Sequence, residues 1–104
     1  MSGFVVLQHV ECEPAAVYED VLRERGHDVT RVMVADGEPL PDLAAYAGIV
    51  AMGAPQSVTE PGAHAWLAPE LDAIAGAVRR DTPYWGVCFG AQLLAAALGA
   101  RVWR

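Results

Sequence analysis

The chain has 104 residues, of which 54% are hydrophobic, and it carries a formal net charge of −6 at pH 7. This length fits one small domain, the apolar share indicates a globular protein, and the negative charge argues against nucleic acid or an anionic membrane as a partner. A membrane span, a secretory signal, a disulfide framework and a zinc site are not expected, since apolar runs are short and only Cys12 and Cys88 are present, which favours the cytoplasm.

The first half of the chain reads as strand, helix, strand and loop. Residues 3–8 form a short apolar, β-branched run typical of a buried strand. Residues 14–25 have apolar positions at helical spacing, with Pro14 near the start and Gly26 just past the end, so they predict an amphipathic helix. A second strand is expected over residues 28–34, before a loop rich in glycine and proline over 36–41.

The second half repeats this alternation around a long irregular segment. Its predicted elements are a strand at 48–52, a loop at 53–63, a helix at about 64–80, a strand at 84–87, a helix at 89–98 ending at Gly99, and the start of a fifth strand at Arg101. Strands that alternate with helices predict right-handed crossovers and a parallel sheet. The fold class expected is therefore α/β, a flavodoxin-like three-layer sandwich with a mostly parallel sheet, cut off after the last helix.

Cys88 has the most distinctive surroundings in the chain. It stands between Gly86 and Gly90, at the turn from an apolar strand into an alanine-rich helix. A side chain at such a turn is pushed out toward substrate, and glycines on both sides allow strand and helix to approach closely. The unpaired N–H groups at the helix start favour negative charge, hence the thiolate, which is the attacking species of a cysteine nucleophile.

The pattern Gly-x-Cys-x-Gly-x-Gln, met at Gly86, Cys88, Gly90 and Gln92, resembles the nucleophile elbow of the class I (triad) glutamine amidotransferases. Four further segments resemble stand-alone members related to the glutaminase domain of GMP synthase: 4–11, 22–29, 49–58 and 64–67. Together these motifs cover nearly all of the chain in the right order. The resemblance implies that residues 1–104 are the N-terminal part of a single domain of this family.

The resemblance also implies roles for individual residues. Cys88 would be the nucleophile that attacks the side-chain amide of glutamine, and Gln92 would bind the substrate. Gly53, Ala54 and Phe89 would form the oxyanion site, although the family usually has Gly-Gly-Pro where this chain has Gly53-Ala54-Pro55. Alanine keeps the N–H donor, provided that the loop holds it in an ordinary backbone region. No cofactor or metal is implied, and the ammonia would pass to a synthetase partner or a fused domain.

The chain departs from the family in its histidines. A class I triad takes its base from a His-x-Glu motif far downstream of the cysteine, whereas His9, His27 and His64 all precede Cys88, so none matches the triad histidine by position. The missing base predicts a fragment completed by a C-terminal half. A natural truncation and one subunit of a two-chain enzyme are the other interpretations.

Two other classes of function stay open. Without the base, the chain is also consistent with an inactive pseudoenzyme or a glutamine-binding module. Gly-x-Cys-x-Gly further describes cysteine hydrolases of the same elbow type, acting on an ester or lactone, and the intracellular-protease-like superfamily, although Gln92 and the loop 53–58 argue against these. For the remaining polar residues we expect plain roles: a solvated loop for His9 and Glu11, an incidental thiol at Cys12, a helix start at His64 and a turn at Asp81 and Thr82.

Overall fold

Four parallel strands form the centre of the molecule in the computed structural model, which describes residues 3–10, 15–54 and 64–100. They are β1 (Phe4–Gln8), β2 (Val29–Met33), β3 (Gly48–Ala51) and β4 (Tyr84–Gly86). Their order across the sheet is β2-β1-β3-β4, with every pair parallel. This order confirms the predicted flavodoxin-like α/β fold. The strand expected at Arg101 lies outside the described residues.

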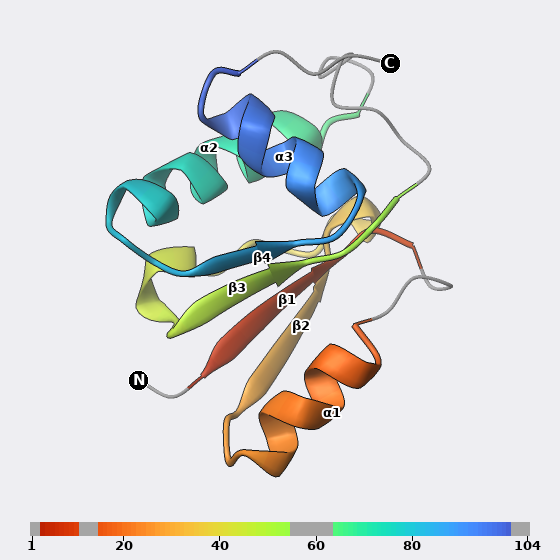
Figure 1. Ribbon diagram of the computed structural model, residues 1–104. Coiled ribbons are helices and arrows are strands. Elements are labelled where there is room, and N and C mark those ends of the chain that lie inside the picture. Colours follow the sequence, from red (N-terminus) through yellow and green to blue (C-terminus); the bar gives the residue numbers. More distant parts are fainter. Residues whose placement is uncertain (1–2, 11–14, 55–63, 101–104) are drawn as a thin grey trace.

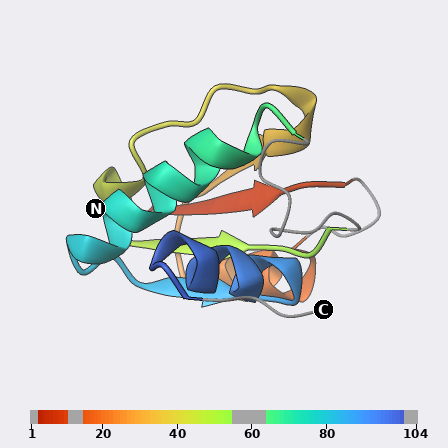
Figure 2. The same cartoon turned by 90° about the horizontal axis from the view of Figure 1, so that it is seen from above.

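Helices cover both faces of the sheet and so make three layers (Figures 1 and 2). The helices α2 (Leu67–Arg79) and α3 (Phe89–Ala97) lie on one face, and α1 (Val17–Glu24) lies on the other. Two short 3-10 turns, Val34–Asp36 and Leu43–Ala45, occupy parts of the connection between β2 and β3. All three layers were expected, whereas the 3-10 turns were not.

Two helices begin later than predicted, for local reasons. Ala16 has a φ of 43°, which is incompatible with an α-helix, so α1 starts at Val17 rather than at 14. Residues 65 and 66 form a turn, in which the Leu67 N–H donates to the His64 carbonyl at 3.2 Å. The α2 helix therefore starts at Leu67 rather than at 64.

The helix ends agree with the glycines that predicted them. After α1, Gly26 has a φ of 83°, its N–H donates to the Arg23 carbonyl, and the next N–H donates to the Leu22 carbonyl. Gly99 closes α3 in the same way, also with a φ of 83°. This double hydrogen bond is a Schellman motif, which needs a left-handed residue after the helix and so favours glycine.

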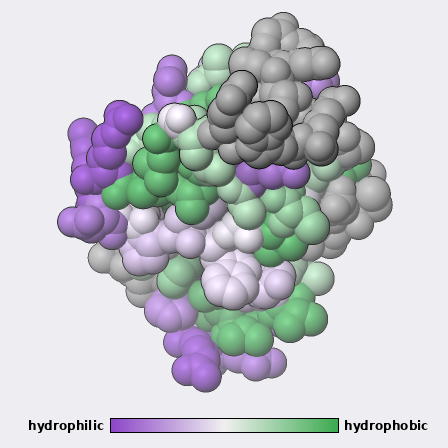
Figure 3. Space-filling model, turned by 45° about the horizontal axis from the view of Figure 1, so that its top comes forward, coloured by the Kyte–Doolittle hydropathy of each residue, from purple (hydrophilic) through white to green (hydrophobic). Residues whose placement is uncertain are grey.

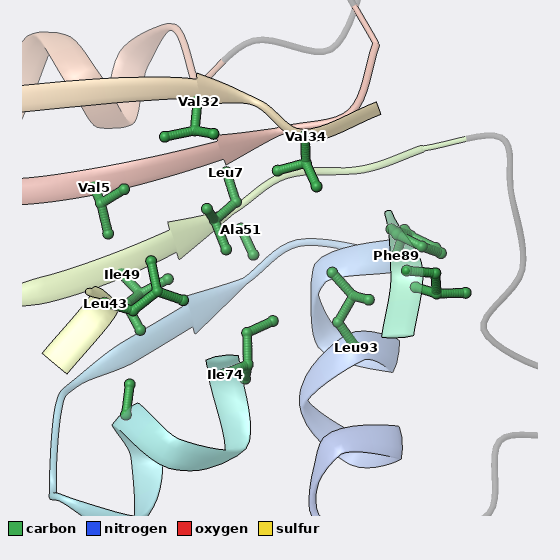
Figure 4. Close-up of a cluster of buried hydrophobic side chains, with 12 residues drawn as sticks. Val5, Leu7, Val32, Val34, Leu43, Ile49, Ala51, Ile74, Phe89 and Leu93 are labelled. Atoms are coloured by element: carbon green, nitrogen blue, oxygen red, sulfur yellow. The ribbon is translucent and has the colours of Figure 1, made fainter. Parts of the chain in front are cut away.

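The larger part of the core lies between the sheet and the pair α2 and α3 (Figure 4). Alternate residues of β1 and β3 point into it: Val5, Leu7 and Ile49 belong to this cluster and are at most 1% exposed. Ile74 of α2 and Leu93 of α3 meet them from the other side. This packing fixes α3, and with it Cys88, against the carboxyl end of β3.

The face beneath α1 is less completely covered. A smaller cluster there contains Val6, Val50 and Met52, and α1 has no buried residue. Val17 and Trp85 are 68% and 58% exposed. On the other side of the molecule, which Figure 3 shows in part, apolar residues also reach the surface among hydrophilic ones. Part of the hydrophobic share of the sequence thus lies at the surface.

Candidate active site

Cys88 occupies a strained backbone position directly before α3. Its φ is 52° and its ψ is −110°, and its side chain is exposed. Positive φ is uncommon for a residue other than glycine, costs on the order of 1–3 kcal/mol, and is concentrated at functional sites. The first turn of α3 is built on this residue, because the N–H groups of Ala91 and Gln92 both donate to the Cys88 carbonyl. The thiol is thus presented to solvent at a helix N-terminus.

The two glycines beside Cys88 are required by the close contact of strand and helix. A Cβ atom on Gly86 would lie 2.6 Å from the carbonyl carbon of Gly90. A Cβ atom on Gly90 would lie 2.0 Å from the carbonyl oxygen of Ala51 in β3. Both distances are far below those of real Cβ contacts. The structure thus agrees with the sequence argument that these glycines allow strand and helix to approach closely.

The residues predicted for the oxyanion site lie where β3 and β4 end. Gly53 is buried and Ala54 half-buried, and Ala54 packs against the core cluster that contains Phe89. Among the described residues, those other than glycine with a positive φ are Ala16, Asp81 and Cys88, so Ala54 meets its condition of an ordinary φ. Within residues 3–10, 15–54 and 64–100, no hydrogen bond uses the N–H of Ala54 or Phe89. Neither N–H is therefore satisfied by another described residue.

Gln92 lies one helical turn after Cys88. Its backbone N–H donates to the Cys88 carbonyl at 3.2 Å, and its side chain is exposed. The side-chain amide is therefore accessible from solvent on the same helix that carries the thiol.

His9 differs from the expectation of a solvated loop. It is 3% exposed, and its ring Nε2 lies 2.6 Å from Oε2 of Glu70, which is itself fully buried. The other ring nitrogen, Nδ1, lies 3.2 Å from the carbonyl oxygen of Met52. The prediction for His9 was wrong because its partners come from elements 43 and 61 residues away in the chain. Glu11 and Cys12, for which plain roles were also expected, lie outside the described residues.

A signal for Glu70 was present in the sequence. It stands four residues after Trp66 and four before Ile74, so it belongs to the same stripe of α2 as these apolar residues. A carboxylate on a buried stripe requires a partner. Sequence reasoning noted the stripe but missed the acid within it.

Each of the three histidines makes other contacts within the described residues. Both ring nitrogens of His9 are already engaged, with Glu70 and with the Met52 carbonyl. The ring of His27 contacts Phe4 at the opposite, amino end of β1, and the ring of His64 is stacked on Trp66. The described residues therefore supply a candidate nucleophile and candidate donors, and no hydrogen bond among them joins Cys88 to a histidine.

Tyr84 links β4 to α3, the strand and helix of the elbow. Its hydroxyl donates to the Gly90 carbonyl at 2.6 Å. Burial, and in second place the negative charge of Glu70, raise the pKa of the Tyr84 hydroxyl well above its usual value of 10. The phenol thus stays a hydrogen-bond donor throughout the neutral and mildly alkaline range.

Replacing Tyr84 by phenylalanine is expected to lower the free energy of unfolding by about 1 kcal/mol at pH 7, since one buried hydrogen bond is lost. Above pH 10 the unfolded tyrosine loses its proton while the folded one keeps it, so wild-type stability falls and the difference between the two proteins shrinks. Urea unfolding at pH 7 to 11 measures both quantities, with Tyr46→Phe as the matched control. A difference that grows with pH would contradict the assignment.

A hollow of about 500 Å³ lies elsewhere at the carboxyl edge, at the end of β2. It is lined by residues 34–38, Leu40, Ala65, Trp66 and Pro69, and Cys88 is not among them. No group of three or more potential metal ligands occurs in the part of the chain that the structure describes. Over the same residues, no helix is long and apolar enough to cross a membrane.

A parallel sheet between two layers of helices, with a strained cysteine at a strand-to-helix turn, defines an α/β protein with a nucleophile elbow. The family model described as glutamine amidotransferase class-I matches residues 15–104. The chain belongs to this family.

Known relatives agree with this assignment. The chain is 36% identical over 88 residues to a GMP synthase (glutamine-hydrolyzing) of Leifsonia xyli. This match covers 85% of the chain and 14% of that protein. It matches the structure of a glutamine amidotransferase from Thermotoga maritima with a TM-score of 0.90 and 30% identity, over 98% of the chain and 45% of that protein. A glutamine amidotransferase from Methylobacillus flagellatus matches with a TM-score of 0.87 and 27% identity, over 95% and 39%. The chain thus spans less than half the length of each relative.

Proposed function

We propose that Cys88 is the nucleophile of a glutaminase reaction and that residues 1–104 form the N-terminal part of a class I glutamine amidotransferase domain. The observation that carries the proposal is the backbone of Cys88, with its φ of 52° and its exposed thiol at the start of α3. Such strain persists only where the surrounding structure enforces it, and here Gly86 and Gly90 make room for it. Family membership supplies the substrate class, glutamine.

In the proposed reaction the Cys88 thiolate attacks the side-chain amide carbon of glutamine. A carbon–sulfur bond forms, and the carbonyl oxygen becomes an oxyanion that accepts hydrogen bonds from the N–H groups of Ala54 and Phe89, next to Gly53. The carbon–nitrogen bond then breaks, and the nitrogen leaves as ammonia after taking up a proton. Water hydrolyses the resulting γ-glutamyl thioester to glutamate and restores the thiol. Gln92 binds the polar end of the substrate.

The base that moves these protons is expected from outside the described residues. A His-x-Glu pair supplied by a C-terminal half, or by a second chain, fits the family resemblance. The ammonia would pass to a synthetase partner or a fused domain in the cytoplasm. No step requires a cofactor.

Covalent labelling with a chloromethyl ketone analogue of glutamine tests the nucleophile. The thiolate displaces chloride, so a single adduct is expected in the intact mass, and an excess of free glutamine is expected to prevent it. Cys88→Ala should abolish the adduct, whereas Cys12→Ala, which removes the only other cysteine, should retain it. Labelling that glutamine does not slow, or that persists in Cys88→Ala, would sink the proposal.

A glutamine-binding module without turnover is the second candidate. It is favoured by one observation: among the described residues no hydrogen bond joins Cys88 to a histidine, and both ring nitrogens of His9 are engaged elsewhere. Glutamate release, followed for the same preparation that is labelled, separates the two candidates. Protected labelling with no glutamate formed would favour the binding module.

A further inference from the structure

We propose that His9 is a positioning residue, which orients the oxyanion loop through the Met52 carbonyl and is itself held in place by Glu70. The oxyanion role of residues 52–54 rests on the proposed function, whereas their positioning by His9 does not. The proposal gives a role to a buried polar cluster that the proposed reaction otherwise leaves unused.

Met52 directly precedes the residues predicted for the oxyanion site. It lies between the last residue of β3 and the pair Gly53 and Ala54. Its N–H donates to the Leu7 carbonyl at 3.0 Å, and its carbonyl oxygen lies 3.2 Å from Nδ1 of His9. Because a peptide unit is planar, fixing the Met52 carbonyl also fixes the direction of the Gly53 N–H, which points the opposite way. His9 therefore sets where the loop begins.

The two contacts of the His9 ring determine where its protons lie. A carbonyl oxygen only accepts hydrogen bonds, so Nδ1 of His9 must carry a proton. One further proton lies between Nε2 and Oε2 of Glu70, which are 2.6 Å apart. Whether this proton resides on the ring or on the carboxyl group, the pair is neutral as a whole, which suits side chains that are both 0% exposed. The Met52 carbonyl thus requires Nδ1 to be a donor, and the contact of Nε2 with Glu70 holds the ring in this orientation.

The ring of His9 also contacts the nucleophile elbow. The centre of its ring lies 5.1 Å from that of Phe89, at an interplanar angle of 76°. It lies 5.6 Å from the ring of Trp66, which precedes α2. Phe89 directly follows Cys88, so one side chain contacts both segments that carry the predicted N–H donors. A shift of His9 would change the distance between these donors.

The pair of His9 and Glu70 is energetically costly to bury. Oε1 of Glu70 is buried and has no hydrogen-bond partner among the described residues. A buried ionisable pair is in general a poor source of stability compared with apolar residues of similar volume. Its hydrogen bonds are directional, however, and an apolar side chain could not orient the Met52 carbonyl. Orientation accounts for the pair better than stability does.

Two substitutions of His9 separate the two hydrogen bonds. The side-chain amide nitrogen of asparagine can replace Nδ1 and keep the bond to the Met52 carbonyl, whereas that of glutamine can replace Nε2 and keep the bond to Glu70. In ¹H–¹⁵N spectra, the amide signals of Gly53 and Ala54 are expected to stay near their wild-type positions in His9→Asn and to move in His9→Gln. Signals that move equally in both variants, or in neither, would overturn the proposal.

Labelling by the glutamine chloromethyl ketone supplies the functional readout. The maximal rate should fall about tenfold in His9→Gln and stay within about threefold in His9→Asn, with the half-saturating concentration unchanged in both, because a displaced donor loses part of its effect. Labelling by iodoacetamide, which needs no oxyanion site, should be equal in all three proteins. Equal labelling of both variants by the chloromethyl ketone would contradict the role of His9.

Two further observations keep the proposal open to refutation. If glutamine does not protect the wild type from labelling, the proposed function fails, while the amide signals still decide the positioning of the loop. If both variants unfold, the wild-type protein alone gives an answer, since the side-chain ¹⁵N spectrum must show a proton on Nδ1 of His9. An unprotonated Nδ1 would overturn the proposal.

Discussion

Gly90→Ala is expected to destabilise the protein by about 3 kcal/mol or more, at the upper end of what overpacking costs. The added methyl group would lie 2.0 Å from the carbonyl oxygen of Ala51 and 3.1 Å from its Cβ atom. The first clash is with the backbone at the end of β3, an inner strand, so no side chain can rotate away to relieve it. Strand and helix would have to separate at the point where Cys88 is held.

The chain offers a matched control in Gly76. This glycine is also helical, within α2, but it is exposed, and a Cβ atom built on it meets nothing within 4 Å. Gly76→Ala should therefore raise the free energy of unfolding by about 0.5–1 kcal/mol. Urea unfolding of both variants checks the pair. Equal and small effects would show that strand and helix can move apart at little cost, contrary to the geometry.

Glu70→Ala is expected to cost about 3–5 kcal/mol, the range for removing one partner of a buried pair. The substitution leaves Nε2 of His9 buried at 0% exposure without its partner. Glu70→Gln should cost much less, because an amide can either accept a hydrogen bond from Nε2 or donate one to it. Asp72→Ala, at an exposed position of the same helix, should change stability by less than about 0.5 kcal/mol.

A double substitution checks the physical reason. His9→Leu combined with Glu70→Met removes both polar groups, and its cost should be clearly smaller than the sum of the two single costs, since no unpaired group remains. Additive costs in urea unfolding would mean that the two side chains do not interact. Thermal unfolding monitored by circular dichroism would serve as the second measurement.

Local rules account for most of the fold. The four described strands lie within the predicted ranges, because β-branched apolar runs between glycines and prolines leave few other conformations. Gly26 and Gly99 end their helices where expected, because left-handed residues are cheapest as glycine. Helix starts were less predictable. The starts of α1 and α2 depend on Ala16 and on the turn before Leu67, neither of which has a capping signal.

The sequence by itself determined the alternation of strands and helices, the parallel sheet and the cysteine between Gly86 and Gly90. Each of these follows from neighbours in the chain, whose spacing is visible without a structure. Only the tertiary structure decided that Glu70 and His9 form a buried pair, and that the pair holds the Met52 carbonyl. These contacts join the ends of β1 and β3 to α2. No local pattern determines which polar groups meet once these elements pack.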